Sequence, residues 1–159
     1  MENRPEEVGP VPSAFHTILF GGLAVGVLDA IAATVNAGIR GVGPARVWQY
    51  VASSILGSES FNGGTTTAMV GLLFHFGVSF GVATVFYVLT RIFPALLRYA
   101  LIVGPLYGIA VYFAMTYLIV PLTAVKQGQF SWSGLITGCI IHMLFVGLPV
   151  GLIAKRYAR

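Results

Sequence analysis

Charged residues are scarce in this chain. They make up 9% of its 159 residues, whereas hydrophobic residues make up 57% and the mean hydropathy is +0.86. Soluble domains carry about a quarter of charged residues, so this composition excludes a soluble globular domain. Cysteine is almost absent, since Cys139 is the only one. A single cysteine excludes both an intrachain disulfide and a cysteine-based zinc site.

The chain also lacks the residue sets of conventional catalysis. It has no Ser-His-Asp order and no phosphate-cradling loop, and Asp29 and Glu59 are the only acidic residues outside its first seven positions. We therefore predict that the protein is not an enzyme. The formal charge of +4 comes from Lys and Arg near the ends of apolar runs, where lipid headgroups explain it better than nucleic acid. We expect no nucleic-acid partner.

Four long apolar runs occupy most of the sequence. A helix needs about 20 apolar residues to cross roughly 30 Å of hydrocarbon. The runs cover residues 15–39, 66–89, 100–120 and 133–154. They predict an all-α integral membrane four-helix bundle, with one four-span domain over residues 15–154 in contact with the lipid bilayer. Residues 1–14, which are rich in proline and acidic residues, predict a disordered head, and residues 155–159 form a basic tail.

Residues 44–57, between the first two spans, have the pattern of a short interfacial amphipathic helix. The segment begins with proline and ends with glycine, as helices often do. Trp48 and Ile55 lie on an apolar side, and Gln49 and Ser53 lie opposite. This pattern predicts a helix that lies on the membrane as a spacer or, alternatively, one that covers the polar interior as a lid.

The basic residues are distributed unevenly between the two ends of the spans. Six lie on the side that carries both termini, and three lie on the other side. The first group is Arg4, Arg91, Arg98, Lys155, Arg156 and Arg159, and the second is Arg40, Arg46 and Lys126. Because cytoplasmic segments carry the excess of Lys and Arg, we expect a multi-pass protein of the cell inner (plasma) membrane with both termini in the cytoplasm.

Glycines recur four residues apart on every span, a spacing that lets membrane helices approach closely. We expect these ridges to pack the helices, and one outward ridge could form a homodimer. The glycines are Gly22, Gly26, Gly77, Gly81, Gly104, Gly108, Gly134, Gly138, Gly147 and Gly151. A short similarity also relates Gly71 and His75 of the second span to Gly138 and His142 of the fourth. It points to a parallel duplication of a helical hairpin.

Four polar residues lie at a similar depth, one on each span. Asp29, His75 and His142 lie about nine residues from the same end of their spans, and Tyr112 lies about as far along the third. At 1.5 Å per residue this depth is roughly 13 Å. A charged carboxylate there costs at least about 2.5 kcal/mol, so we expect Asp29 to be protonated or paired with a histidine and to face the interior. The sequence predicts one buried polar layer.

Three interpretations of this layer compete. In the one that we favour, the four residues satisfy one another's hydrogen bonds in a non-catalytic protein, and no cofactor is bound. In the second, Asp29, His75 and His142 bind a metal ion, or the two histidines bind a haem, in a redox membrane protein. In the third, the layer is a path for protons or a small solute, with Asn36 at its mouth.

Several short motifs follow one another along the spans. They are His75-Phe-Gly-x-x-Phe-Gly-x-Ala83, Phe93-Pro94, Gly104-x-x-x-Gly108, Pro121-Leu122 and Gly138-x-x-x-His142. On these motifs, the chain from Gly21 to Arg156 resembles the YagU-like bacterial inner-membrane proteins and related four-helix families of unknown function. The resemblance implies a bacterial inner-membrane protein of unassigned biochemical activity, linked to acid or envelope stress, and it implies no catalytic residues.

Overall fold

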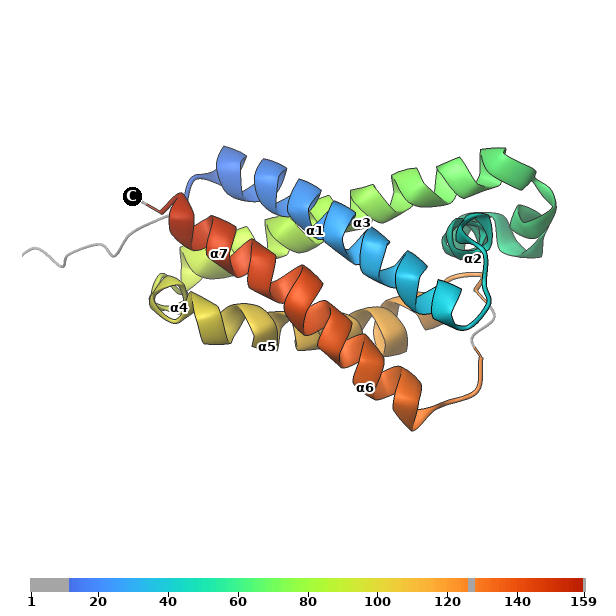
Figure 1. The fold of residues 1–159 in the computed structure, drawn as a ribbon. Coiled ribbons are helices and arrows are strands. Elements are labelled where there is room, and N and C mark those ends of the chain that lie inside the picture. Colours follow the sequence, from blue (N-terminus) through green and yellow to red (C-terminus); the bar gives the residue numbers. More distant parts are fainter. Residues whose placement is uncertain (1–11, 126–127, 159) are drawn as a thin grey trace, which may run out of the picture.

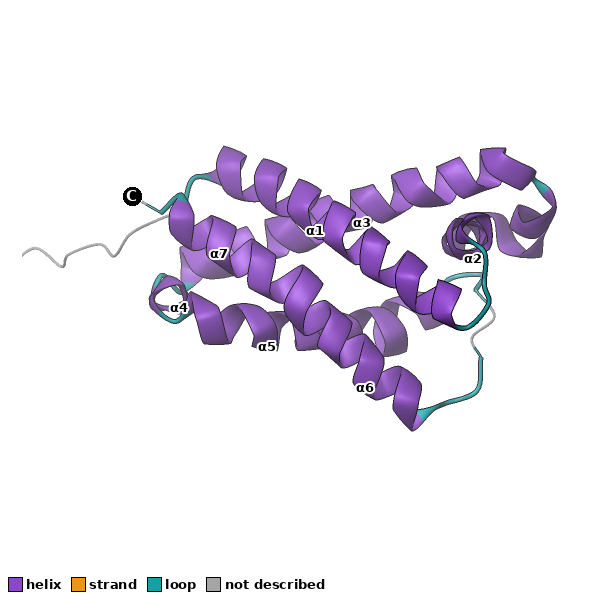
Figure 2. Ribbon diagram, in the orientation of Figure 1, coloured by secondary structure: helices purple, strands orange, loops and turns teal. Residues whose placement is uncertain are grey.

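The computed structural model describes residues 12–125 and 128–158, and every regular element among them is a helix (Figure 2). Four of these helices are long and apolar enough to cross a membrane. The predicted all-α helical bundle is therefore confirmed, and the chain is a helical membrane protein. Residues 1–11 of the predicted head lie outside the described residues, as do Lys126 and Arg159.

The four long helices begin and end within about three residues of the predicted spans. The first is α1 (Ala14–Ile39), and the second is α3 (Gly64–Ile92). The third consists of α5 (Ala100–Phe113), the π-helix η2 (Ala114–Ile119) and the short 3-10 helix η3 (Val120–Leu122). The fourth consists of α6 (Trp132–Ile141), the π-helix η4 (His142–Gly147) and α7 (Leu148–Arg156). Spans three and four therefore each change their hydrogen-bond register partway across.

The described N- and C-terminal residues lie together at one end of the bundle, near the short helix α4 (Ala95–Arg98), and α2 (Pro44–Leu56) lies across the other end (Figure 1). We call these the terminal end and the α2 end. Pro44 opens α2, and Gly57 ends it with a φ of 64°, which glycine adopts without a steric penalty. The 3-10 helix η1 (Gly57–Asn62) then leads into α3.

Helix α2 packs on α3 with part of its polar side, which differs from the simple amphipathic prediction. Gln49 is 7% exposed, whereas Ile55 on the apolar side is 57% exposed. The side-chain nitrogen of Gln49 donates to the carbonyl oxygen of Gly64 at 3.0 Å. Gly71 allows the close approach, because a Cβ there would overlap the carbonyl group of Trp48. A hydrogen bond and a small residue thus fix α2 to α3 instead of leaving it free on the lipid surface.

Seven of the expected packing glycines lie at helix crossings. Gly22 and Gly26 of α1 lie under the rings of Phe80 and Phe76 of α3, and Gly138 lies under the ring of Tyr112. Spans three and four meet backbone to backbone at four glycines. These are Gly104, Gly108, Gly147 and Gly151. Such contacts are favourable in lipid because they maximise van der Waals packing between helices.

Three of the expected packing glycines behave differently. A Cβ at Gly77 or Gly81 would meet nothing within 4 Å, and one at Gly134 would meet only Ser131, which caps the same helix. Gly81 instead lines an apolar groove of about 420 Å³ between α3 and span three. The glycine ridge on α3 is therefore uncovered by the described residues, because α3 packs on α1 and α2 through its other faces.

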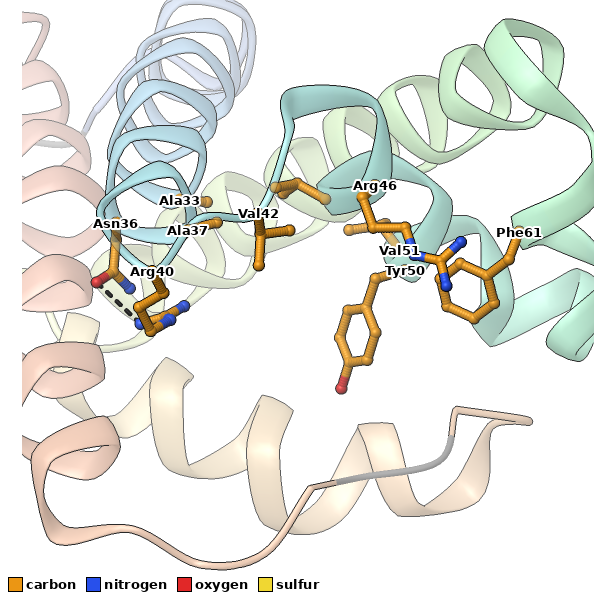
Figure 3. Close-up of a pocket in the computed structure, with 10 residues that line it drawn as sticks. Ala33, Asn36, Ala37, Arg40, Val42, Arg46, Tyr50, Val51 and Phe61 are labelled. Atoms are coloured by element: carbon orange, nitrogen blue, oxygen red, sulfur yellow. Dashed lines mark hydrogen bonds between the residues drawn. The ribbon is translucent and has the colours of Figure 1, made fainter.

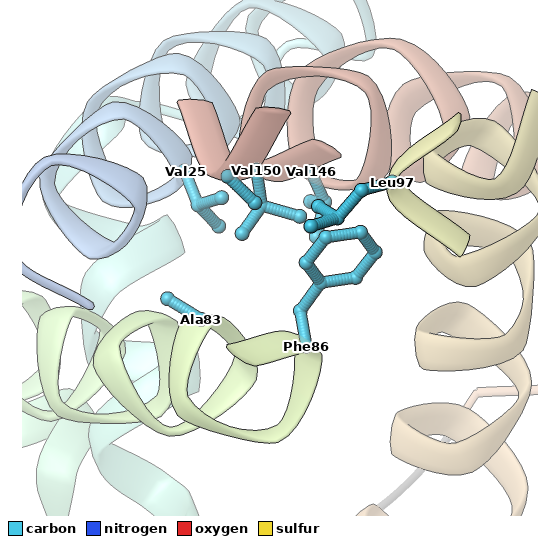
Figure 4. Packing of buried hydrophobic residues seen from close by; sticks show 7 residues of the cluster. Val25, Ala83, Phe86, Leu97, Val146 and Val150 are labelled. Carbon is cyan, nitrogen blue, oxygen red and sulfur yellow. The ribbon is translucent and has the colours of Figure 1, made fainter. Parts of the chain in front are cut away.

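The apolar core includes Leu97 of α4 and Ala154, so it lies toward the terminal end of the bundle. Figure 4 shows how its side chains pack. Phe86 of α3 is 1% exposed and packs against the ring of Tyr107 at 5.0 Å between centroids. Its buried neighbours come from spans one, two and four and from α4, and span three contributes partly buried residues such as Tyr107. The buried neighbours are Val25, Ala83, Leu97, Val146, Val150 and Ala154. At the α2 end, by contrast, neither η2 nor α6 buries a residue. The bundle is closed at the terminal end and open at the α2 end.

Candidate functional site

His75 lies on α3 where α1 and α2 both reach it. Its Nε2 donates to the carbonyl oxygen of Gly26 on α1 at 3.0 Å, and this nitrogen carries the proton because a carbonyl only accepts. The ring of Trp48 on α2 lies 5.3 Å from the imidazole, measured between centroids. This histidine therefore ties α3 to α1, and the Trp48 ring of α2 lies against it.

His142 begins the π-helix of span four and contacts a different helix. Its Nδ1 donates to the carbonyl oxygen of Gly138, one turn earlier, at 3.0 Å. Its ring meets the ring of Tyr112 edge to face, with centroids 5.2 Å apart. In the expected hairpin duplication, Gly138 would correspond to Gly71, yet Gly138 receives a tyrosine ring and Gly71 receives the backbone of α2. The matched motifs therefore have different partners.

Asp29 is half-buried on α1 and has no hydrogen-bond or ion-pair partner among the described residues. The expected pairing with a histidine does not form there. In the described part of the chain, no three His, Cys, Asp or Glu side chains gather, so Asp29, His75 and His142 are not brought together as a metal-ligand set.

The physical reason is that equal depth fixes the height of a residue along the bundle but not its direction around the helix. His75 is turned toward α1 and α2, and His142 is turned toward span three. In place of one polar layer, the structure has two separate histidine contacts and a carboxyl group without a partner among the described residues.

A cavity of about 510 Å³ opens at the α2 end, between the last turns of α1, helix α2 and η1 (Figure 3). This volume is within the range of small-molecule and cofactor sites. Most of its wall is apolar and comes from small alanine and valine side chains of α1 and α2. The larger and more polar lining residues are Asn36, Arg40, Arg46, Tyr50 and Phe61.

Two arginines line this cavity, and no acidic residue does so among those described. Nη1 of Arg40 donates to the side-chain oxygen of Asn36 at 3.0 Å. The guanidinium carbon of Arg46 lies 4.1 Å from the centroid of the Phe61 ring, a cation–π contact. Figure 3 shows the two guanidinium groups on opposite sides of the cavity. Neither is paired with a carboxylate of the described residues, so the cavity carries two uncompensated positive charges.

Tyr50 projects from α2 and belongs to the wall of two further cavities (Figure 3). One is a hollow of about 80 Å³ beside Ser53, and the other has about 310 Å³ and includes Tyr112 and Tyr117 of span three. Burial raises the pKa of the Tyr50 phenol above its ordinary value of 10.0. The hydroxyl therefore stays protonated near neutral pH and can both donate and accept a hydrogen bond.

The sequence predicts Asn36 at the mouth of a path, but it does not predict the cavity that Asn36 lines. From the sequence, Arg40 and Arg46 indicate only the orientation of the chain in the membrane. One available signal was the pair of arginines on either side of a short turn, next to an amphipathic helix and with no acid nearby. The cavity itself depends on how α2 folds back between two spans, which no local pattern specifies.

No protein-family model, no curated protein and no solved structure matches the chain. The resemblance to YagU-like proteins therefore stays a prediction. The geometry of the α2 end is therefore the basis for assigning a function.

Proposed function

We propose that this protein is a non-catalytic membrane protein that binds an anionic lipid in the cavity at its α2 end. The lipid phosphate would lie between Arg40 and Arg46, and an acyl chain would follow the apolar wall formed by α1 and α2. The observation that carries this proposal is a pair of arginines with no carboxylate partner among the described residues, in a cavity whose wall is otherwise mostly apolar.

The chemistry of arginine supports a phosphate as the anionic group. A guanidinium presents several N–H donors in one plane and binds phosphate oxygens in a bidentate way, which a lysine ammonium cannot do. Arg40 follows directly on the last residue of α1, so its charge lies near the membrane interface, where phosphates of lipids are found. Each basic residue near an anionic membrane surface contributes about 1 kcal/mol to lipid attraction.

The membrane and the orientation are part of the same proposal. Both termini lie in the cytoplasm of a bacterial cell, and the α2 end faces the outer side of the inner membrane, in line with the YagU-like resemblance. The uneven distribution of Lys and Arg supports this orientation. A Ser58→Cys variant in a Cys139→Ser background tests it, because Ser58 is exposed at the α2 end. We expect a membrane-impermeant maleimide to label this cysteine in intact cells, and labelling only after lysis would reverse the orientation.

A second copy of the chain is the proposed partner of the uncovered ridge on α3. Gly77 and Gly81 leave open space beside an apolar groove, and small residues at this spacing allow two membrane helices to approach. Native mass spectrometry of the detergent-solubilised protein measures the dimer directly. We expect Gly81→Leu to reduce the dimer fraction, while Gly134→Leu, outside any helix crossing, leaves it unchanged.

Lipid titration of the purified protein tests the binding site. In a neutral detergent, native mass spectrometry gives the apparent Kd for phosphatidylglycerol. We expect an Arg40→Gln, Arg46→Gln double variant to bind roughly thirtyfold more weakly, which corresponds to about 2 kcal/mol. The matched control is Arg91→Gln, Arg98→Gln, which removes two exposed charges at the terminal end.

Three results would contradict the lipid site. Equal loss in both double variants would show that only net charge matters. No loss in either would show that the arginines do not bind the lipid. Competition by inorganic phosphate at concentrations near the lipid Kd would show a site for free phosphate in place of a lipid headgroup.

A further inference from the structure

A cavity of about 310 Å³, which we call the second cavity, shares Tyr50 with the arginine-lined one. Its wall comes from three parts of the chain: Tyr50 of α2, the outer half of span three, and the segment that leads into α6. Because Tyr50 lines both cavities, the two adjoin at this side chain.

The second cavity is polar but uncharged over the described residues that line it. Its polar groups are phenol hydroxyls, an amide and aliphatic hydroxyls, and they share the wall with aromatic ring faces. The residues that supply them are Tyr50, Tyr112, Thr116, Tyr117, Gln129 and Ser131. Some of these groups already form hydrogen bonds within the protein. Tyr112 bonds to Thr116, and the Ser131 hydroxyl accepts from the backbone N–H of Gly134.

Neutral hydroxyl and amide groups of this kind suit a hydroxyl-rich ligand. Each hydroxyl of a polyol both donates and accepts, as phenols and hydroxyls of the protein also do, and an amide offers both roles at once. The C–H faces of a polyol pack against aromatic rings. A second anionic group has no cation among the described lining residues to bind.

An ammonium headgroup is the main competitor, because aromatic rings also attract cations. The neighbouring cavity carries Arg40 and Arg46, and its described lining includes no acidic residue to offset them. A ligand ammonium beside these two guanidinium groups would be repelled, and like charges placed together across an interface oppose binding. The electrostatics therefore favour a neutral headgroup.

We infer that the second cavity binds the uncharged polyol headgroup of the anionic lipid whose phosphate lies between Arg40 and Arg46. The ligand class is thus a phospholipid with a glycerol or sugar headgroup, and phosphatidylglycerol is its simplest member. This inference rests on the proposed lipid site and adds the identity of the headgroup. Tyr117 and Gln129 hold the headgroup, and Tyr50 contacts the ligand in both cavities.

The experiment compares phosphatidylglycerol with phosphatidylmethanol of the same acyl chains. Both lipids carry one phosphodiester charge, and only the first has a polyol. We expect the full-length protein in neutral detergent to bind phosphatidylglycerol roughly tenfold more tightly, as two added neutral hydrogen bonds would give. A Tyr117→Phe, Gln129→Ala variant should lose this preference and keep its affinity for phosphatidylmethanol. Tyr99→Phe, which changes an exposed tyrosine at the terminal end, should keep the preference.

The outcomes separate the two proposals. Equal binding of the two lipids by the wild type overturns the headgroup inference and leaves the anionic site standing. Tighter binding of phosphatidylcholine than of phosphatidylglycerol overturns it in favour of an ammonium site. Failure of both anionic lipids to bind overturns the proposed function itself. A preference that survives in the Tyr117→Phe, Gln129→Ala variant shows that the polyol lies elsewhere.

Discussion

The two ends of the bundle are built from different kinds of contact. At the terminal end, Gly104 and Gly147 bring spans three and four together backbone to backbone, and Phe86 fills the space among the helices. At the α2 end, a short helix packed on α3 lies across the bundle, and the facing parts of spans three and four bury nothing. The cavities around Tyr50 all lie at this second end.

The difference shows how a small membrane protein can separate stability from binding. Moving apolar surface from lipid to protein gains no hydrophobic free energy, so close packing in a membrane depends on shape. Glycines and a central aromatic ring supply that shape at the terminal end. At the α2 end, the cavities around Tyr50 leave polar side chains room to bind water or a ligand. Variants at the first end should therefore affect folding, and variants at the second should affect binding.

The largest expected effect is at the backbone contact of the terminal end. A Cβ at Gly104 would lie 2.7 Å from the carbonyl oxygen of Gly147, and backbone atoms cannot move aside easily. Gly104→Leu should lower the free energy of unfolding by about 3 kcal/mol or more, or prevent folding. Denaturation in detergent, followed by circular dichroism, measures this change.

The matched control for Gly104 is the uncovered ridge of α3. Gly77→Ala should leave the stability of the monomer unchanged or raise it slightly, because alanine is the better helix former and a Cβ there would meet nothing within 4 Å among the described residues. If Gly77→Ala were as damaging as a change at Gly104, the two glycine ridges would not differ as the structure indicates, and a second chain covering the α3 ridge would be the first explanation to examine.

Core packing should give the next largest effect. Phe86→Ala removes a ring that is 1% exposed and should lower the free energy of unfolding by about 3 kcal/mol. Tyr50→Ala, at the open end, removes a ring that is 44% exposed and should lower it by less than about 1 kcal/mol. Parallel unfolding curves in the same detergent compare the two. Equal losses would mean that the α2 end contributes as much to stability as the core.

Much of the fold could be predicted from the sequence, because its signals are local. Apolar runs of the right length give the spans, and a proline and a glycine mark the ends of α2. The buried side of α2 could not be predicted, since the hydrogen bond from Gln49 to Gly64 depends on a contact between two helices. Amphipathic periodicity reports exposure to water or lipid, and it is silent about a polar side chain that finds a partner on a neighbouring span.

The candidate site shows the same limit more clearly. Depth along the membrane was predictable for Asp29, His75 and His142, because residues can be counted from the span ends. The direction in which each side chain points around its helix could not be predicted, because it depends on which helices pack against one another. The cavity around Arg40 and Arg46 was missed for the same reason, since α1, α2 and η1 form it together.

A smaller and local effect is expected where α2 joins α3. Gln49→Ala removes the hydrogen bond to Gly64 and should cost about 1 kcal/mol. The loss should appear mainly as faster hydrogen exchange in α2, while the core around Phe86 stays protected. Arg98→Ala, which truncates an exposed side chain at the terminal end, is the control and should leave exchange in α2 unchanged. Uniformly faster exchange through all spans would show that α2 and the core unfold as one unit.

Replacing either histidine should lower the free energy of unfolding by less than the Gln49→Ala change described above. His75→Ala removes a hydrogen bond to another helix, a loss that averages about 0.6 kcal/mol in membrane proteins. Among the described residues, His142 forms a hydrogen bond only within its own helix, so His142→Ala should cost less unless its contact with Tyr112 contributes. Thermal unfolding of both variants in one detergent compares them. A larger loss for His142 would point to the Tyr112 contact as the stronger of the two.

The smallest effect is expected at Asp29. Asp29→Asn keeps the size and polarity of the side chain, and the described structure gives the carboxyl no partner to lose. The free energy of unfolding should therefore change by less than about 0.5 kcal/mol. A loss above about 1 kcal/mol would mean that the carboxyl is hydrogen-bonded in the membrane, as in the single polar layer that equal depth predicts. Unfolding of Asp29→Asn together with the Asp29→Asn, His75→Ala double variant decides the point, because independent sites give additive losses and a shared network does not.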